Sequence, residues 1–160
     1  MSTTAKRKAS KRSKARSVVR ERPNHKYGSP TLVSAKHVAS TQAVQHVAKG
    51  LPFKEIETLR DQIDEPLESL GRHLSISRST LQRRRAGRRL TPQESDRVLR
   101  FCRLLRHAVG VFGDLDRARQ WLKFPQRGLG GAVPLDYASS EIGAREVDDL
   151  LGRIEYSVYC

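Results

Sequence analysis

The stretch LGGAVPLDYASSEIGAREVDDLLGRIEYSVYC (Leu129–Cys160) constrains this chain more than any other part of it. Ser140 predicts the N-cap of a helix, and Glu141 in the first turn suits the positive end of the helix dipole. Helical spacing places five apolar residues on one face, namely Val147, Leu150, Leu151, Ile154 and Val158. Because no later element is expected to cover this helix, part of its face should pack on preceding helices. Its tip, with Tyr156 and Tyr159, should be free to dock on another protein.

Two more helices are predicted immediately upstream. Thr91-Pro92-Gln93-Glu94 is a capping box with proline at the first helical position, which is a strong start signal. An apolar stripe follows at helical spacing and consists of Val98, Cys102, Leu105, Val109 and Phe112. It predicts a helix of about five turns that ends at Gly113. Asp114 should cap a shorter helix with Trp121 and Leu122, which Pro125 ends.

Three short helices are predicted further upstream, where Gly50-Leu51-Pro52 marks the expected start of packed structure. The first carries an apolar face made by Phe53, Ile56, Leu59 and Ile63. Asp64 is expected to cap the second, and Ser77 to cap a third that closes near Gly87. A short turn joins the second helix to a third helix that is rich in Arg and Gln. This pattern is typical of a helix-turn-helix.

The outer face of the third helix is the candidate DNA-reading surface. If Leu81 points to the core, Ser79, Gln82 and Arg83 are free to reach base edges, where Gln and Arg can pair bidentately with adenine and guanine. The phosphate-binding and flanking residues are predicted to be Arg78, Arg84, Arg88 and Arg89. A three-helix bundle with a merely solvated arginine face is the alternative interpretation.

The distribution of charge favours DNA over that alternative. Met1–Arg22 holds nine Lys or Arg and one Glu, a net charge of +8, and Arg72–Arg106 has a net charge of +9. Pro23–Gly71 is nearly neutral at −1, and His107–Cys160 is mildly acidic at −2. Concentrated positive charge fits a polyanion, most simply DNA, whereas the acidic end should have a different partner. Residues 1–50 are predicted to be a basic, largely disordered tail and linker, either an arm for phosphates or a solubilising tail.

Other classes of protein find little support in the residues. Two cysteines do not make a disulfide framework, which predicts a reducing, intracellular compartment, and no apolar run is long enough to span a membrane. The histidines do not have metal-ligand spacing with either cysteine. No catalytic constellation appears, so we expect neither an enzyme nor a cofactor. The acidic residues near the C-terminus are best interpreted as a solvated helix face.

The C-terminal pattern resembles the toxin-binding domain of the Xre/MbcA/ParS antitoxin family, and most closely the Xre antitoxins that are paired with RES-domain toxins. The matching residues are Ala118, Trp121-Leu122, Pro125, Leu129-Gly130-Gly131, Pro134-Leu135-Asp136, Glu141–Val147 and Leu150–Tyr156. Upstream, Thr80–Arg84 and Leu90 with Glu94–Arg97 look like the family's helix-turn-helix and linking helix. The similarity covers roughly residues 51–160.

This resemblance implies a type II antitoxin that binds and blocks a RES toxin, an enzyme that degrades NAD. It also implies a homodimer that represses its own operon and binds operator DNA, in a bacterial cytoplasm. The C-terminal end would occlude the toxin's active site. The toxin contacts that the resemblance implies are Arg153, Glu155, Tyr156, Tyr159 and Cys160. Packing of Tyr156 and Tyr159 under the chain's own helix is the alternative.

The expected architecture is therefore all-α. Residues 51–112 would form the helix-turn-helix DNA-binding and dimerisation domain, and residues 113–160 the small toxin-binding domain. A second hypothesis is a stand-alone helix-turn-helix regulator whose C-terminal helices serve only dimerisation.

Overall fold

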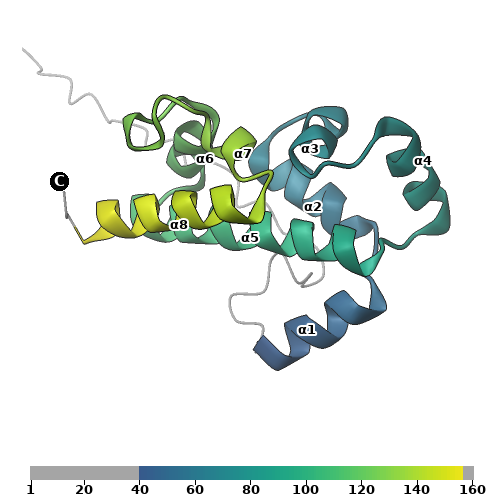
Figure 1. Ribbon diagram of the computed structural model, residues 1–160. Coiled ribbons are helices and arrows are strands. Elements are labelled where there is room, and N and C mark those ends of the chain that lie inside the picture. The colour runs from purple at the N-terminus through teal and green to yellow at the C-terminus, as the bar shows by residue number, and fades with distance from the viewer. Residues whose placement is uncertain (1–39, 157–160) are drawn as a thin grey trace, which may run out of the picture.

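The computed structural model describes residues 40–156, and every regular element within this range is a helix (Figure 1). In chain order these elements are α1 Ser40–Lys49, α2 Lys54–Ile63, α3 Leu67–His73, α4 Arg78–Gly87, α5 Pro92–Phe112, α6 Leu115–Lys123, the 3-10 turn η1 Arg127–Leu129, α7 Pro134–Tyr137 and α8 Glu141–Glu155. The predicted all-α class is confirmed. The basic arm Met1–Arg22, Tyr159 and Cys160 lie outside the described residues.

Helix α5 is the axis on which the other elements are assembled. It contacts α1, α2, α6 and α8 along its length, and α8 lies beside it (Figure 1). The predicted capping box starts it, since the Thr91 side chain accepts from the Glu94 amide while the Glu94 carboxylate accepts from the Thr91 amide. Gly113 ends it in a left-handed conformation. The predicted boundaries of this helix are confirmed.

The apolar stripe of α5 forms the centre of the core. Val98, Phe101 and Leu105 are buried within one cluster that includes residues from α2 to α8. Cys102 belongs to the same cluster, and burial raises the pKa of its thiol far above the ordinary value. The Cys102 side chain is therefore a small apolar core group and stays protonated.

The predicted helix-turn-helix is formed by α3 and α4. A β-carbon at Gly71 would come within 2.5 Å of the Leu81 side chain, so glycine at this position lets the two helices approach closely. The turn between them contains no glycine, and Ser75 takes the left-handed conformation with φ 54°. Arg97 of α5 braces this strained turn, because its Nη1 donates to the Leu74 and Ser75 carbonyl oxygens at 3.3 and 3.1 Å.

One predicted helix end differs from the structure. Asp64 does not cap α3. It ends α2 in a left-handed conformation with φ 60°, and α3 begins after Pro66 without a side-chain cap. Helix α4, in contrast, ends at Gly87 as predicted, and Arg88 takes the left-handed position that follows it. Asp is one of the few residues that tolerate this conformation, which explains why a predicted N-cap can serve as a C-cap.

Helix α1 places packed structure earlier than the expected start at Gly50. Its half-buried side chains Ala43 and Val47 pack against the core, and the helix contacts α5. Arg89 fixes the end of α1, since its Nη1 donates to the Lys49 and Gly50 carbonyl oxygens at 3.1 and 3.0 Å. Residues 40–49 were predicted to belong to a largely disordered tail and linker, and α1 corrects that prediction.

The C-terminal half consists of α6, η1, α7 and α8, and its predicted caps are confirmed. Asp114 accepts from the Arg117 amide, and Ser140 accepts from the Gly143 amide. A β-carbon at Gly143 would lie 1.9 Å from the Tyr137 carbonyl oxygen, so only glycine allows α7 to lie against α8. Val147 and Leu151, on the inner face of α8, are fully buried. The helix is thus fixed to the core through its last complete turns.

Glu94 links the start of α5 to α4 and makes stability depend on pH. Burial alone would raise the pKa of its carboxyl group, but hydrogen bonds from Thr91 and the ion pair with Arg84 outweigh burial and hold this pKa below its ordinary value. A depressed pKa in the folded state contributes stability above the unfolded-state pKa of about 4.3. This stability is lost as pH falls through the folded-state value.

Glu94→Gln should therefore lower the free energy of unfolding at neutral pH by about 1 kcal/mol, because it keeps the shape of the cap but removes the charge that Arg84 pairs with. Urea unfolding of both proteins at neutral pH and near pH 3 checks this. The difference should shrink in acid, and a difference that is the same at both pH values would contradict the assignment.

Candidate functional site

The outer face of α4 carries the three residues that were predicted to read bases. Leu81 is the only buried residue of this helix, and Ser79, Gln82 and Arg83 are exposed. Arg78 pairs with Glu68 across 3.1 Å, yet its side chain is 77% exposed. A short helix that presents exposed Gln and Arg side chains on one face has the geometry for insertion into a major groove.

The structure separates the predicted phosphate ligands into two kinds. Arg84 is largely buried, and its Nε lies 2.8 Å from a Glu94 carboxylate oxygen, so it clamps α4 to α5. Arg89 donates to carbonyl oxygens at the end of α1. The Arg88 side chain makes no such contact with the described residues and is exposed. Arg85, which the sequence interpretation left out, is also exposed beside Glu57 at 3.8 Å.

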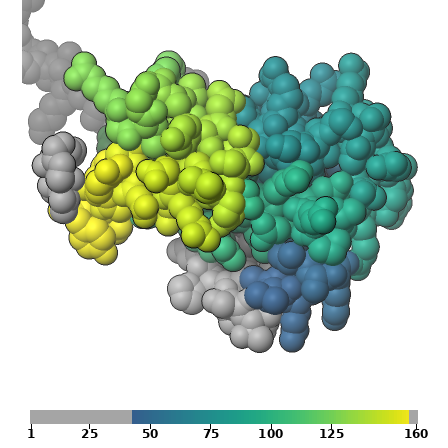
Figure 2. Space-filling view, in the orientation of Figure 1, coloured from purple at the N-terminus to yellow at the C-terminus, as the bar shows by residue number. Residues whose placement is uncertain are grey.

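The tip of α8 lies at the opposite end of the molecule from α4 (Figure 1). Tyr156 is 76% exposed, so the alternative in which this ring packs under its own helix does not describe the structure. Arg153 is exposed, and Glu155 lies 3.5 Å from Nε2 of His107. Figure 2 shows the two ends as separate lobes of the surface, with the α8 side in yellow-green and the helix-turn-helix side in teal.

A groove of about 520 Å³ runs along the outer side of α8. His107 of α5 forms one wall, and its Nδ1 lies 2.7 Å from an Asp148 carboxylate oxygen. The lining residues are His107, Glu146, Asp148, Asp149, Gly152, Arg153 and Tyr156. The sequence interpretation placed these acidic side chains on a plain solvated face. The groove was missed because His107 is 41 residues from Asp148 and comes from a different helix.

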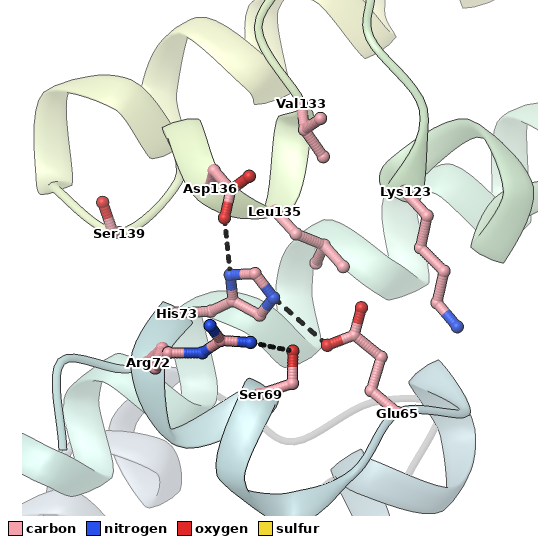
Figure 3. Close-up of a pocket in the computed structure, with 9 residues that line it drawn as sticks. All are labelled: Glu65, Ser69, Arg72, His73, Lys123, Val133, Leu135, Asp136 and Ser139. Carbon is pink, nitrogen blue, oxygen red and sulfur yellow. Dashed lines mark hydrogen bonds and ion pairs between the residues drawn. The ribbon is translucent and has the colours of Figure 1, made fainter. Parts of the chain in front are cut away.

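A second cavity, of about 470 Å³, lies between the two halves of the chain. Figure 3 shows the His73 imidazole pointing toward two carboxylates that come from different halves. Its Nε2 is 3.1 Å from Glu65 and its Nδ1 is 3.0 Å from Asp136 of α7. The His73 ring therefore bridges the loop before α3 and α7, one in each half of the chain.

Cationic side chains of α6 make further polar contacts between the two halves of the chain. Arg119 donates to the carbonyl oxygens of Asp61 and Gln62, and Lys123 donates to the Asp64 carbonyl oxygen at 2.6 Å. These carbonyls are at the C-terminal end of α2, where they have no partners within the helix and where the helix dipole favours a positive charge. The C-terminal half is therefore joined to the helix-turn-helix half by polar contacts as well as by α5.

Within residues 40–156, no group of three His, Cys, Asp or Glu side chains is placed to hold a metal ion. None of the helices in this range is both long and apolar enough for a bilayer crossing.

These features define a class: a helix-turn-helix protein with a second, helical binding domain attached to its C-terminal side. Comparison with family models agrees with both parts. Residues 42–103 match the antitoxin Xre-like helix-turn-helix domain, and residues 107–156 match the antitoxin Xre/MbcA/ParS C-terminal toxin-binding domain. The boundary between the matches lies inside α5, the helix shared by both halves.

Three curated relatives, each named antitoxin Xre, are similar to the chain. The protein of Photorhabdus laumondii is 37% identical over 112 residues, which is 69% of this chain and 76% of the relative. That of Yersinia enterocolitica is 36% identical over 121 residues, or 74% and 82%. That of Pseudomonas putida is 32% identical over 65 residues, 41% of each chain. The chain belongs to the Xre antitoxin family, as the sequence resemblance predicted.

Proposed function

We propose that this protein is the antitoxin of a type II toxin–antitoxin system that neutralises a RES-domain, NAD-degrading toxin and represses its own operon. The observation that carries the proposal is the placement of two exposed surfaces at opposite ends of one rigid α5 axis (Figure 1). One is the polar and basic face of α4, and the other is the tip of α8 within the matched toxin-binding domain. Opposite placement lets the chain hold DNA and toxin at once.

Operator binding is assigned to α4. Ser79, Gln82 and Arg83 are the proposed base-reading residues, and Arg78, Arg85 and Arg88 are the proposed contacts to phosphate. Arg84 and Arg89 are given a structural role instead, because their guanidinium groups hold α4 to α5 and the end of α1. A homodimer would present two copies of α4 to two half-sites of an operator.

Toxin neutralisation is assigned to the C-terminal tip. Arg153, Glu155 and Tyr156 are exposed there, and Tyr and Arg are frequent anchors of protein interfaces. Tyr159 and Cys160 are the further proposed contacts beyond the described residues. A helix end that enters the toxin's active-site cleft would block NAD without any catalytic residue of the antitoxin, so the proposed action is non-catalytic.

The direct test uses the purified chain and a purified RES-domain toxin, which is to be sought in the reading frame beside this one. NAD consumption by that toxin should fall to background as the antitoxin is titrated to a fixed stoichiometric ratio, and the two proteins should elute together in gel filtration. Undiminished NAD consumption with no complex would refute the proposal.

A further inference from the structure

The acidic groove beside α8 is a feature that the proposed toxin contacts at the tip of α8 do not include. Every residue that lines the 520 Å³ groove lies between residues 107 and 156, inside the matched toxin-binding domain. The 470 Å³ cavity, in contrast, is shared with α3 and the loop before it. A partner that contacts only the C-terminal domain can therefore reach the α8 groove. The exposed Tyr156 side chain lies at one end of the groove.

Two carboxylates in this groove have no partner among the described residues. Asp148 and Glu155 face the two nitrogen atoms of His107, but Glu146 and Asp149 make no hydrogen bond or ion pair there. Most exposed carboxylates elsewhere in residues 40–156 are paired with an arginine or a histidine, for example Glu68 with Arg78. Glu146 and Asp149 are thus negative charges held on a rigid helix and open to solvent.

We propose that this groove receives cationic side chains of the toxin, and that these are the groups with which the toxin holds the phosphates of its dinucleotide. The inference rests on the proposed function. An enzyme that degrades NAD must bind a pyrophosphate, and proteins bind phosphate with arginine, lysine and helix N-termini. Glu146 and Asp149 offer carboxylate oxygens to the same groups, with Tyr156 packing beside them.

The groove's charge argues against other occupants. Three carboxylates, Glu146, Asp148 and Asp149, outnumber the one arginine that lines the groove, Arg153, so DNA would be repelled. The chain's own basic arm, Met1–Arg22 with its net charge of +8, is complementary in sign and is the competing occupant. Deletion of residues 1–22 distinguishes this arm from the toxin.

The test compares the double variant Glu146→Gln, Asp149→Asn with a matched control, Asp61→Asn, Asp64→Asn, in the full-length chain. Both variants remove two exposed carboxylates, and Asn tolerates the left-handed backbone of residue 64. Affinity for the purified toxin is measured by calorimetry at low and high salt. The groove variant should bind about tenfold or more weakly, with a shallower salt dependence, while the control binds like the wild type. Operator affinity should be unchanged in both.

Two results separate the groove assignment from the proposed function. If the wild-type chain does not bind the toxin, the proposed function fails. If it binds and the groove variant binds equally well at both salt concentrations, the proposed function stands and the groove assignment is overturned.

Two further arms identify the occupant. ADP, which carries a pyrophosphate, should compete with the wild-type chain for the toxin and weaken their binding. If ADP does not compete, the cationic groups that enter the groove are not the toxin's phosphate-binding groups, and that assignment is overturned. The affinity difference should persist in a chain that lacks residues 1–22. Loss of the difference on this deletion would show that the arm occupies the groove and would overturn the proposal.

Discussion

Deletion of residues 155–160 is expected to lower affinity for the toxin by about 100-fold or more, and to leave operator binding and folding intact. Interface energy is concentrated in a few anchors, and this deletion removes four of the five proposed toxin contacts, including the exposed Tyr156. Leu151, the last fully buried residue of α8, is retained, and Glu155 and Tyr156, which are removed, are exposed. NAD consumption by the toxin, measured with increasing antitoxin, gives the loss of neutralisation.

Two controls distinguish an antitoxin from a regulator whose C-terminal helices serve only dimerisation. Thermal unfolding should show the same midpoint with and without the deletion, and an operator gel shift should give the same affinity. The point variant Tyr156→Ala should reproduce a large part of the effect on the toxin. If the deletion abolishes operator binding together with neutralisation, the C-terminal helix is a dimerisation element and the antitoxin mechanism is wrong.

Arg83→Ala is expected to weaken operator binding by about 1–3 kcal/mol and to relax the preference for one base in the site. Arg83 is exposed on the face of α4 opposite the buried Leu81, where a guanidinium group can pair with guanine. Fluorescence anisotropy with the operator and with single-base variants of it measures both effects. Arg88→Ala should instead weaken binding to all sequences and reduce the salt slope by about one, as expected for a phosphate contact.

The matched control for Arg83 is Arg103→Ala. Arg103 is exposed on α5, so this variant removes the same charge from a surface outside α4. It should change operator affinity much less than Arg83→Ala. Equal losses in the two variants would mean that only net charge matters, and would contradict α4 as the reading helix.

Local signals made much of this fold predictable from sequence. The N-caps at Ser77, Thr91, Asp114 and Ser140 were all predicted, because a cap depends on residues within one turn of it. The α5 stripe was equally direct, since its apolar spacing extends over many turns. The resemblance to the antitoxin family rested on short motifs in the same segments, and the family comparisons confirm it.

Contacts between distant residues were not predictable in this way. In the sequence, Arg84 and Arg89 cannot be told apart from Arg83 and Arg88, since all four are arginines in one basic segment. Only the fold reveals that Glu94 holds Arg84 and that the end of α1 holds Arg89. His73 carried no signal either, because its two carboxylate partners lie eight residues before it and in a helix far along the chain. The α8 groove required His107 and α8 to come together, which periodicity does not encode.

Polar contacts join the helix-turn-helix half of the chain to its C-terminal half. Arg119 and Lys123 fix α6 to the end of α2, and His73 ties α3 to α7. Helix α4 packs on α3, so these contacts also connect α4 to the C-terminal half.

Hydrogen–deuterium exchange of the full-length chain, with toxin alone and with operator alone, tests the central claim most directly. Exchange slows where a partner covers or stabilises the backbone. Toxin should protect the end of α8 around Arg153–Tyr156 and the groove, and operator should protect α4 at Arg78–Gly87. If the toxin instead protects α4 and leaves the end of α8 unchanged, the two functions do not lie at opposite ends of this molecule.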